Sequence, residues 1–270
     1  EENLAEVIDD IELIRGDIRD YDTVTKAVAG VDRVLHQAAL PSVPKSVADP
    51  VTANEVNITG TLNVLEASRQ AGVKRFVMAS SCAVYGDSQE LPKHEGMMPA
   101  PLSPYAVGKL CDEYYCKVYW TLYQFPTVVL RYFNVFGPRQ DPKSEYAAVI
   151  PRFIARLHDG EQPIVFGDGE QSRDFVYVDN VVAANLLACE QNGMLGGVFN
   201  VGAGTELSLN QLLDKLRAIM HVDIPARYDP PRTGDIRRSY ADNSALLHQG
   251  FKLAVDLDEG LRRTVAYFTS

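Results

Sequence analysis

Short apolar segments alternate with longer helical segments through the first half of the sequence, and this alternation constrains the fold more than any other feature. Strands are predicted at 11–14, 31–39, 74–80 and 127–136. Helices are predicted between them at 21–29, 51–70 and 104–125. Strands that are joined through helices by short turns form a parallel sheet with helices on both faces. The sequence therefore predicts an α/β fold built on a doubly wound parallel sheet.

The sequence after Gly137 has shorter elements and more turns. Helices are predicted at 146–158, 181–190, 209–220 and 258–268, and short strands at 163–166 and 173–178. This pattern is typical of a smaller substrate-binding lobe beside a main domain. We therefore assign residues 1–140 to a Rossmann-type domain. Residues 141–270 are assigned mainly to the substrate lobe, with some segments returning to the main domain.

The charge and the cysteines exclude several classes of partner. A formal net charge of −10 and a pI near 5.0 argue against nucleic acid or an anionic membrane surface. The four cysteines show neither a C-x-x-C pair nor metal-ligand spacing, so we expect reduced, packed thiols and no metal site. No apolar run is long enough to span a bilayer and no signal peptide opens the sequence, so a cytoplasmic location is predicted.

The strand predicted at 74–80 runs into a serine loop, and a long helix follows. Tyr105 and Lys109 are four residues apart on that helix and therefore share one face. Ligands of such sheets bind beyond the carboxyl ends of the strands, so we expect Ser81 to converge there with Tyr105 and Lys109. A nearby cation lowers the pKa of a phenol from its ordinary value of about 10 toward neutrality. The three groups therefore predict a proton-transfer site.

Structural explanations compete with functional ones for several residues. Asp17 is as well explained as the cap of the following helix as it is by ligand binding. His36 is interpreted as a core histidine whose ring bonds to the backbone. The aromatic residues of the helix at 104–125 are interpreted as core packing or as a dimer seam; they are Tyr114, Tyr115, Tyr119, Trp120 and Tyr123.

One expected unit is missing from the start of the sequence. A dinucleotide-binding fold opens with a strand, a Gly-rich turn and a helix whose amino end holds the pyrophosphate. The sequence begins at Glu1 without such a unit. We therefore expect the fold to lack its first βαβ unit, which takes about 30 residues or more.

Several short motifs occur together: Gly16-Asp17-Ile18-Arg19, His36-Gln37-Ala38-Ala39, 80–86, Tyr105-x-x-x-Lys109, 131–137, Arg173-Asp174-Phe175 and Arg232-Thr233-Gly234-Asp235. Through them nearly the whole sequence resembles the extended short-chain dehydrogenase/reductase family, and within it the nucleotide-sugar 4-epimerases. Segments 43–46 and 137–142 make it more similar to the UDP-N-acetylhexosamine 4-epimerases than to the simple UDP-galactose enzymes. The resemblance implies an isomerase of nucleotide-sugar metabolism and polysaccharide biosynthesis, with tightly bound NAD.

The resemblance also implies the role of each motif. Tyr105 would take the proton of the sugar O4, bracketed with Ser81, while C4 gives a hydride to NAD⁺; Lys109 would lower the Tyr105 pKa. The resulting 4-keto sugar would turn over and accept the hydride on its other face. The implied NAD contacts, besides Tyr105 and Lys109, are Asp17, Ile18, Gln37, Ala38, Ala39, Asn57, Ser80, Tyr132 and Phe133. The implied UDP-sugar contacts, besides Ser81, are Asn134, Gln140, Val149, Phe166, Arg173, Arg232, Asp235 and Ser239.

Three positions narrow the chemistry that the resemblance implies. Cys82 and Ala83 stand where sugar-nucleotide 4,6-dehydratases carry an acidic pair, so dehydration is disfavoured. Ser239 stands where simple galactose epimerases carry a bulky Tyr, and a small residue leaves room for an N-acetyl group at C2. The predicted substrates are therefore UDP-GlcNAc and UDP-GalNAc, and UDP-Glc and UDP-Gal stay open as further substrates.

Two alternatives stay open. Another nucleotide-sugar oxidoreductase, such as a UDP-glucuronate 4-epimerase, would need a cation near C6 that the sequence does not place. If residues 1–270 are the whole protein, a non-catalytic protein that binds sugar nucleotides but cannot hold NAD gains support. The resemblance further implies a homodimer whose interface is a four-helix bundle, with two helices from each subunit.

Overall fold

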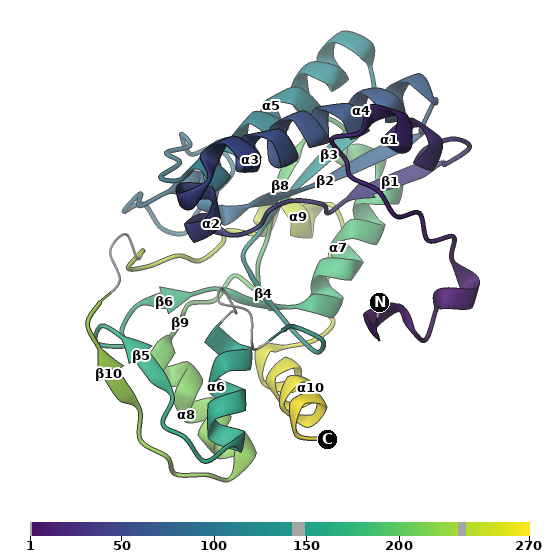
Figure 1. The fold of residues 1–270 in the computed structure, drawn as a ribbon. Coiled ribbons are helices and arrows are strands. Elements are labelled where there is room, and N and C mark those ends of the chain that lie inside the picture. The colour runs from purple at the N-terminus through teal and green to yellow at the C-terminus, as the bar shows by residue number, and fades with distance from the viewer. Residues whose placement is uncertain (1, 142–148, 232–235) are drawn as a thin grey trace.

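The structure, a computed structural model, describes residues 2–141, 149–231 and 236–270, apart from the side chain of Glu2. A four-stranded parallel sheet lies at its centre in the strand order β1-β2-β3-β8 (Figure 1). Its strands are β1 (Arg33–His36), β2 (Arg75–Ser81), β3 (Thr127–Tyr132) and β8 (Val198–Val201). Ser81 pairs with Tyr132, so β2 and β3 end side by side. The predicted α/β fold with a parallel sheet is confirmed.

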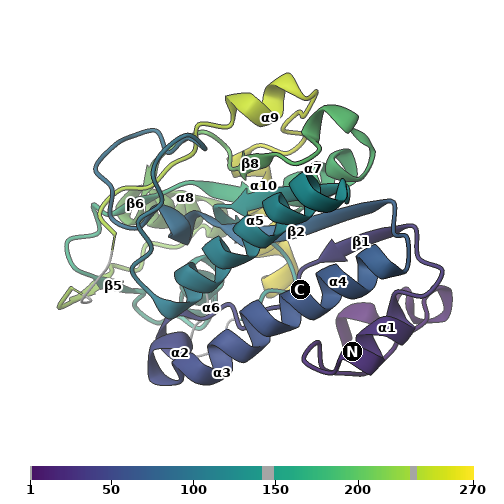
Figure 2. The ribbon, with the colours of Figure 1, turned by 90° about the horizontal axis from the view of Figure 1, so that it is seen from above.

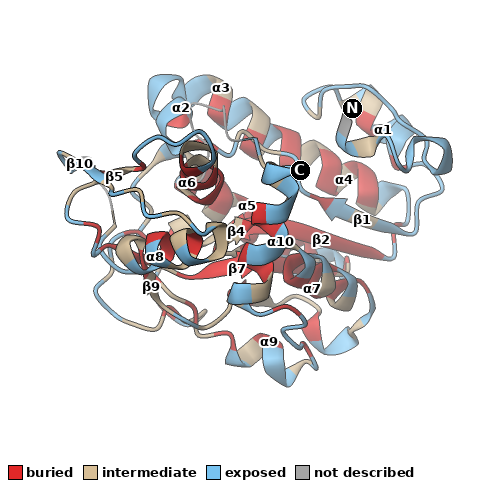
Figure 3. Cartoon of the chain, turned by 90° about the horizontal axis from the view of Figure 1, so that it is seen from below, coloured by how far each residue is buried: buried red, intermediate tan, exposed pale blue. Residues whose placement is uncertain are grey.

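Helices cover both faces of this sheet (Figures 1 and 2). One face carries α1 (Tyr21–Ala27), α3 (Pro50–Asn54), α4 (Thr61–Gln70) and α5 (Pro104–Tyr123), and the other carries α7 (Val178–Glu190) and α9 (Ser244–His248). Leu65 of α4 and Cys116 of α5 pack in one cluster with Phe76 of β2. Ala184 of α7 packs with Val77 from the other face of β2. Two apolar layers therefore enclose β2, which is buried along nearly its whole length (Figure 3).

A smaller lobe lies beyond the carboxyl end of the sheet, around α6 (Val149–His158), α8 (Leu209–Met220) and α10 (Leu257–Thr269) (Figure 1). Its strands form three short ladders: β4 (Asn134–Phe136) with β7 (Phe175–Tyr177), β5 (Ile164–Phe166) with β10 (Arg227–Asp229), and β6 (Ser172–Arg173) with β9 (Leu207–Ser208). The helices enclose a core that includes Phe153, Leu212 and Leu261. From the same half of the sequence, β8, α7 and α9 return to the main sheet.

Short elements complete the described chain. They are α2 (Val43–Ala48), a π-helix (Glu55–Gly60) and 3₁₀ turns at Glu2–Leu4, Ile8–Asp10, Cys82–Tyr85 and Asn192–Met194. The helix predicted at 51–70 therefore consists of α3, the π-helix and α4 in succession. The predicted start of the helix at 146–158 lies outside the described residues, and α6 is described from Val149. Within the described ranges, no helix combines the length and the apolar character that a membrane crossing needs.

Three strand predictions differ from the structure, and one of them, at 173–178, is divided at Asp174 between β6 and β7. The strand predicted at 11–14 is wrong, because these residues have no strand partner and Ile11, Leu13 and Ile14 are exposed. Their alternating pattern fits an extended chain, but a strand also needs a neighbour for its backbone groups. The strand predicted at 127–136 breaks at Phe133, where the chain leaves β3 and begins β4. This break leads the chain from the main sheet into the smaller lobe.

Candidate active site

A cavity of about 510 Å³ lies where β2 and β3 end, between the main sheet and the smaller lobe. Nine residues predicted as site residues line it: Ser80, Ser81, Tyr105, Tyr132, Phe133, Asn134, Val149, Phe166 and Arg173. The carboxyl ends of parallel strands are the usual place for a ligand in such a fold. The cavity therefore brings two of the predicted catalytic residues together with residues predicted to contact the cofactor and the substrate.

Caps at the ends of two elements fix the hydroxyl groups of the site. Ser81 ends β2, and its Oγ accepts a hydrogen bond from a backbone N–H two residues further on at 3.2 Å. Ser103 caps α5 by accepting a backbone hydrogen bond from the first turn. The backbone N of Tyr105 donates to Ser46 Oγ at 3.1 Å, which ties the start of α5 to α2. The Tyr105 ring is thereby carried on a helix end that is held on two sides.

The pKa of Tyr105 is raised, and its main cause is burial of the phenol. A hydrogen bond with the Ser81 hydroxyl acts in the opposite direction and favours the phenolate. The net pKa shift of Tyr105 in the chain by itself is therefore upward, because burial outweighs the groups that favour the phenolate; the predicted joint effect of Lys109 and a nicotinamide cation stays a prediction. The physical reason is that desolvation disfavours a charged phenolate more strongly than the neighbouring polar groups favour it.

Lys109 lies one turn after Tyr105 on the buried face of α5. Its Nζ has no hydrogen-bond partner among the described residues, and the Asp112 Oδ2 atom is 3.9 Å away. Burial lowers the pKa of Lys109, whereas the Asp112 carboxylate raises it. Burying an ammonium without an acceptor costs free energy, so this atom is suited to a ligand that brings hydroxyl groups.

The loop after β1 contains the residues predicted along the dinucleotide cleft. Asn57 holds this loop, because its Oδ1 accepts from Leu40 N at 2.7 Å and its Nδ2 donates to Leu40 O at 3.3 Å. At the other end of the loop, Gln37 Nε2 donates to the Tyr132 hydroxyl at 3.1 Å. The small Ala38-Ala39 pair lies between the two anchors. A loop that is fixed at both ends and small in the middle leaves its backbone accessible to a ligand.

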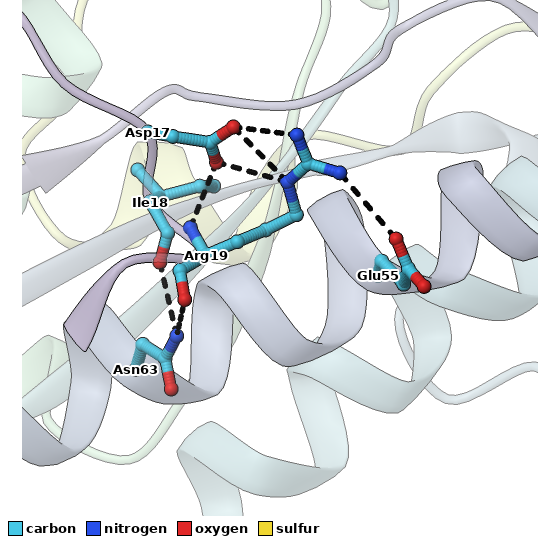
Figure 4. A network of polar contacts seen from close by, with 5 residues as sticks. All are labelled: Asp17, Ile18, Arg19, Glu55 and Asn63. Atoms are coloured by element: carbon cyan, nitrogen blue, oxygen red, sulfur yellow. Dashed lines mark hydrogen bonds and ion pairs between the residues drawn. The ribbon is translucent and has the colours of Figure 1, made fainter.

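Asp17 and Ile18 lie in the loop before α1 and are not among the residues that line the cavity (Figure 4). The Asp17 carboxylate accepts hydrogen bonds from the Arg19 backbone at 2.9 Å and from its guanidinium at 2.6 Å. These bonds lower the pKa of Asp17 to about 2. Asn63 Nδ2 donates to the Ile18 and Arg19 carbonyls at 3.1 and 3.0 Å. The alternative interpretation of Asp17 as a helix cap is wrong, because Asp20 caps α1.

Four of the predicted UDP-sugar contacts do not appear in the lining of the cavity. Gln140 is partly buried, and its Nε2 donates to Val135 O at 3.4 Å. Ser239 is buried and follows Arg238, which bridges to Ser172 of β6. The two others, Arg232 and Asp235, lie outside the described residues.

The sequence reasoning missed two arginines of the cavity. Arg152 and Arg156 lie one turn apart on α6 and line the cavity together with Arg173. Three guanidinium groups around one cavity favour an anionic ligand despite the negative charge of the whole chain. Their four-residue spacing on a predicted helix was a signal that could have indicated a shared basic face.

A buried polar network behind the serine loop was also missed. Arg131 and Glu113 form a two-pronged ion pair with N–O distances of 2.6 and 2.9 Å, and both side chains are 5% exposed. The Ser80 hydroxyl donates to the same carboxylate. Arg131 also donates to the Tyr85 hydroxyl at 2.9 Å, and that hydroxyl donates to Asn200 Oδ1 at 2.7 Å. The network joins β2, β3, α5 and β8 directly behind the active-site serine.

Other interpretations of single residues can now be compared with the structure. His36 is buried as expected, but its Nε2 lies 2.8 Å from Thr61 Oγ1, a side-chain partner in place of the backbone. Burial lowers the pKa of His36 to about 3, so the ring is neutral. The aromatic residues of α5 do not all have the same surroundings. Tyr119 is buried in the core, whereas Tyr114 and Tyr123 are exposed. In the described ranges no cluster of His, Cys, Asp and Glu side chains could hold a metal ion.

The comparisons with known proteins agree on one family. The model described as "NAD dependent epimerase/dehydratase family" matches residues 1–202. A protein described as "Putative UDP-glucose 4-epimerase" from Methanocaldococcus jannaschii is 42% identical over 256 residues, which are 94% of this chain and 83% of that protein.

Two solved structures have the same fold. The UDP-N-acetylglucosamine 4-epimerase from Methanobrevibacter ruminantium M1, in complex with UDP-N-acetylmuramic acid, is 43% identical with a TM-score of 0.91. The match covers 94% of this chain and 82% of that one. The Thermus thermophilus UDP-glucose 4-epimerase in complex with NAD is 38% identical with a TM-score of 0.88, and the match covers 96% of this chain and 85% of that one.

Proposed function

The chain belongs to the NAD-dependent epimerase/dehydratase family, and we propose that it is a UDP-sugar 4-epimerase that acts on UDP-N-acetylhexosamines. One observation carries the proposal: Ser81 and Tyr105 line one cavity together with Arg173. Two hydroxyl groups can act on a sugar hydroxyl at one end of the cavity, and a guanidinium can hold a diphosphate at the other. A sugar nucleotide carries both a sugar hydroxyl and a diphosphate, so it matches both ends of the cavity.

NAD is the cofactor, and residues of this chain fit part of it. Lys109 Nζ is buried without an acceptor, and a ribose would supply hydroxyl oxygens there. The loop that contains Ala38-Ala39 and the Tyr132 ring would form the wall of the cleft. Asp17 stays ionised and could accept hydrogen bonds at the far end. When bound, NAD supplies the hydride acceptor and donor for C4 of the sugar.

Tyr105 serves as the base and then as the acid at the sugar O4. The Ser81 hydroxyl acts on the pKa of the Tyr105 phenol, so it is placed to pass the O4 proton and hold O4. The ammonium of Lys109, one turn away on α5, favours the phenolate when the proton is removed. After the 4-keto sugar turns about its diphosphate, the hydride that bound NAD would supply reaches C4 from the opposite face, and the same phenol returns the proton to O4. Arg173 holds the diphosphate throughout.

Dehydration of the sugar is disfavoured by the residues after Ser81. Cys82 and Ala83 occupy the positions where elimination of water would need an acid and a base. Burial raises the pKa of the Cys82 thiol to about 11, so it stays protonated and is a poor base near neutral pH. These two residues therefore support epimerisation over dehydration within a family that contains both activities.

The preference for N-acetylated sugars depends on Ser239. Ser239 follows Arg238, whose backbone bridges to Ser172, and Ser172 precedes Arg173 of the cavity lining. The small side chain of Ser239 would leave space for an acetamido group at C2. A relative that is 43% identical is named a UDP-N-acetylglucosamine 4-epimerase, which supports the same preference.

Replacement of Ser239 by Tyr is expected to lower kcat/KM for UDP-GlcNAc and to spare UDP-Glc. The added ring fills the space that an acetamido group needs, and overpacking of such a site costs about 1–3 kcal/mol, or about 5- to 150-fold in kcat/KM. The measurement is kcat/KM for both substrates, with Ser239→Ala as the control that keeps the site small. Equal losses of kcat/KM for the two substrates would show that Ser239 does not determine the preference for N-acetylated sugars.

A UDP-glucuronate 4-epimerase is the second candidate, and Arg152 and Arg156 favour it. A sugar carboxylate at C6 needs a cation, and these arginines line the same cavity as Arg173. One of them could bind the diphosphate while the other binds the carboxylate. This candidate shares every step at O4 with the first and differs in the sugar.

The proposed function is tested with purified protein supplied with NAD. UDP-GlcNAc, UDP-Glc and UDP-GlcA are incubated separately, and the anomeric proton signals of the 4-epimers are followed by NMR. We expect UDP-GalNAc from UDP-GlcNAc, and nicotinamide dinucleotide in the supernatant when the protein is freed of unbound NAD by gel filtration and then denatured. Conversion of UDP-GlcA alone would favour the second candidate. Binding of UDP-sugar with neither turnover nor bound nucleotide would point to a non-catalytic binding protein.

We also propose that the protein is a homodimer joined through α5 and α3. Val107, Tyr114, Val118 and Leu122 are exposed along one side of α5, and Val51 is exposed on the adjacent α3. This surface is apolar and two-fold symmetry can bring it against itself.

Val118→Glu is expected to convert the dimer into a monomer, because it would bury two like charges across the symmetric contact. Light scattering coupled to gel filtration measures the mass. Val182→Glu, an equally exposed valine on α7, is the matched control and should leave the mass unchanged. A monomer for the unaltered protein at micromolar concentration would contradict the proposal.

A further inference from the structure

The buried carboxyl group of Asp112 lies beside Lys109 and has no role in the proposed steps at the sugar O4. Asp112 is fully buried, one turn after Lys109 on the same face of α5. Its Oδ2 is 3.9 Å from Lys109 Nζ, and neither carboxylate oxygen has a well-formed hydrogen bond in the described part of the chain. A charged pair that is buried but not hydrogen-bonded is unusual, because each charge pays a desolvation cost that hydrogen bonds normally offset.

The other titratable groups around Lys109 cannot take the place of Asp112. Glu113 is on the same helix, but its carboxylate is bound by Arg131. His36, which faces Lys109 from the end of β1, is neutral. Cys116 on α5 is fully buried, and burial raises the pKa of its thiol. Asp112 is therefore the carboxylate available to Lys109 among the residues that the structure describes.

The two groups act on each other in opposite directions. Burial raises the pKa of Asp112 to about 7, and Lys109 together with the Thr61 hydroxyl opposes that rise. Burial lowers the pKa of Lys109, and Asp112 opposes that fall. The Asp112 carboxyl is therefore mostly ionised above neutral pH, and in that range its charge opposes loss of the proton from Lys109.

We propose that Asp112 is a positioning residue of the active site: its buried carboxylate is the counter-ion that keeps Lys109 protonated and so keeps a cation one turn after Tyr105 on α5. The negative charge of Asp112 also acts on Tyr105 directly and raises its pKa. The benefit of Asp112 to the reaction therefore arises through Lys109 alone. In this respect the inference rests on the proposed function, whereas the charge state of Lys109 can be measured without turnover.

Asp112→Asn keeps the shape of the side chain and removes its charge. The titration of Lys109 is followed by NMR in protein labelled with ¹³C at the lysine Cε, and its signal is assigned by its loss in Lys109→Arg. We expect the Lys109 midpoint in Asp112→Asn to fall by about 1–3 pH units, the usual effect of removing an opposite charge at short range. Lys93 is also fully buried but donates to two backbone carbonyls, and its signal serves as the unchanged internal reference.

Turnover is expected to follow the same shift. The pH profiles of kcat for Asp112→Asn and the unaltered enzyme should coincide near pH 6, where the Asp112 carboxyl is mostly protonated. Near pH 9 the variant should be slower by about tenfold, which corresponds to one pH unit in the Lys109 titration. Asp112→Glu restores a carboxylate and should recover part of the alkaline activity.

An unchanged Lys109 midpoint in Asp112→Asn would overturn the proposal. So would a loss of kcat that is uniform across pH, because a merely structural role predicts that result. If Asp112→Asn does not give folded protein, Asp112→Ala provides the same comparison without a buried amide to satisfy. A shifted Lys109 midpoint in a protein without epimerase activity would refute the proposed function and leave the assignment of Asp112 intact.

Discussion

Tyr105→Phe is expected to lower kcat for UDP-sugar epimerisation by about a thousandfold, within the range of about 10²–10⁴ that a general acid–base group contributes. The change removes one oxygen atom and keeps the ring that lines the cavity. Without the phenol, Ser81 is left as the hydroxyl at O4, and a serine does not ionise near neutral pH. KM should change little, because the diphosphate contacts that we propose for Arg173 are preserved.

The control for this experiment is Tyr267→Phe, which removes the hydroxyl of a partly exposed tyrosine on α10. Steady-state rates, circular dichroism and the amount of nucleotide released on denaturation are compared for the three proteins. The control should keep full activity, and Tyr105→Phe should keep its fold and its bound nucleotide. If Tyr105→Phe retains more than about a tenth of kcat, Tyr105 is not the acid and base of the reaction.

Arg131→Met is expected to reduce the free energy of unfolding by about 3–5 kcal/mol, the range for breaking one side of a buried ion pair. The substitution leaves the Glu113 carboxylate buried without its guanidinium partner, and it removes the donor to the Tyr85 hydroxyl. Chemical denaturation in urea, followed by circular dichroism, measures the loss. The same variant should lower kcat, because Ser80 shares the Glu113 carboxylate and precedes Ser81 in β2.

Arg262→Met is the matched control for this loss. Arg262 pairs with Glu259 at 3.1 Å, but both side chains are largely accessible to solvent on α10. Exposed pairs contribute about 0–1 kcal/mol, so the control should unfold close to the unaltered protein. A similar loss in the free energy of unfolding for both variants would mean that the buried network stabilises the fold no more than an exposed ion pair does.

The strands and helices that carry the site could be predicted because their patterns are local. The apolar run at 74–80 and the long helix from Pro104 correspond closely to β2 and α5. The strand predicted at 11–14 failed because a strand depends on a partner that no local pattern specifies. The break at Phe133 was missed for a related reason: both halves of 127–136 are extended, and only their pairing partners differ.

For the site residues too, local spacing could be predicted from the sequence, whereas burial and long-range pairing could not. The spacing of Tyr105 and Lys109 predicted a shared face, and the structure brings Tyr105 to the cavity with Ser81. The pKa of Tyr105 could not be predicted, since it depends on burial that the sequence does not contain. Arg131 was noticed within a motif, but its pairing with Glu113 joins a strand to a helix and became visible only in three dimensions. Nothing in the sequence indicated the role of Asp112, which depends on its burial beside Lys109.

The passage of the chain from β3 to β4 has a mechanical consequence. Tyr132, in the wall proposed for the cofactor, and Asn134, at the start of β4, are two residues apart in sequence. Consecutive Cα atoms are 3.8 Å apart, so covalent geometry keeps these two Cα atoms within about 7.6 Å of each other. The lining residue Asn134 therefore cannot move far from the lining residue Tyr132, whereas the arginines of α6 have no such short covalent tie to the main sheet.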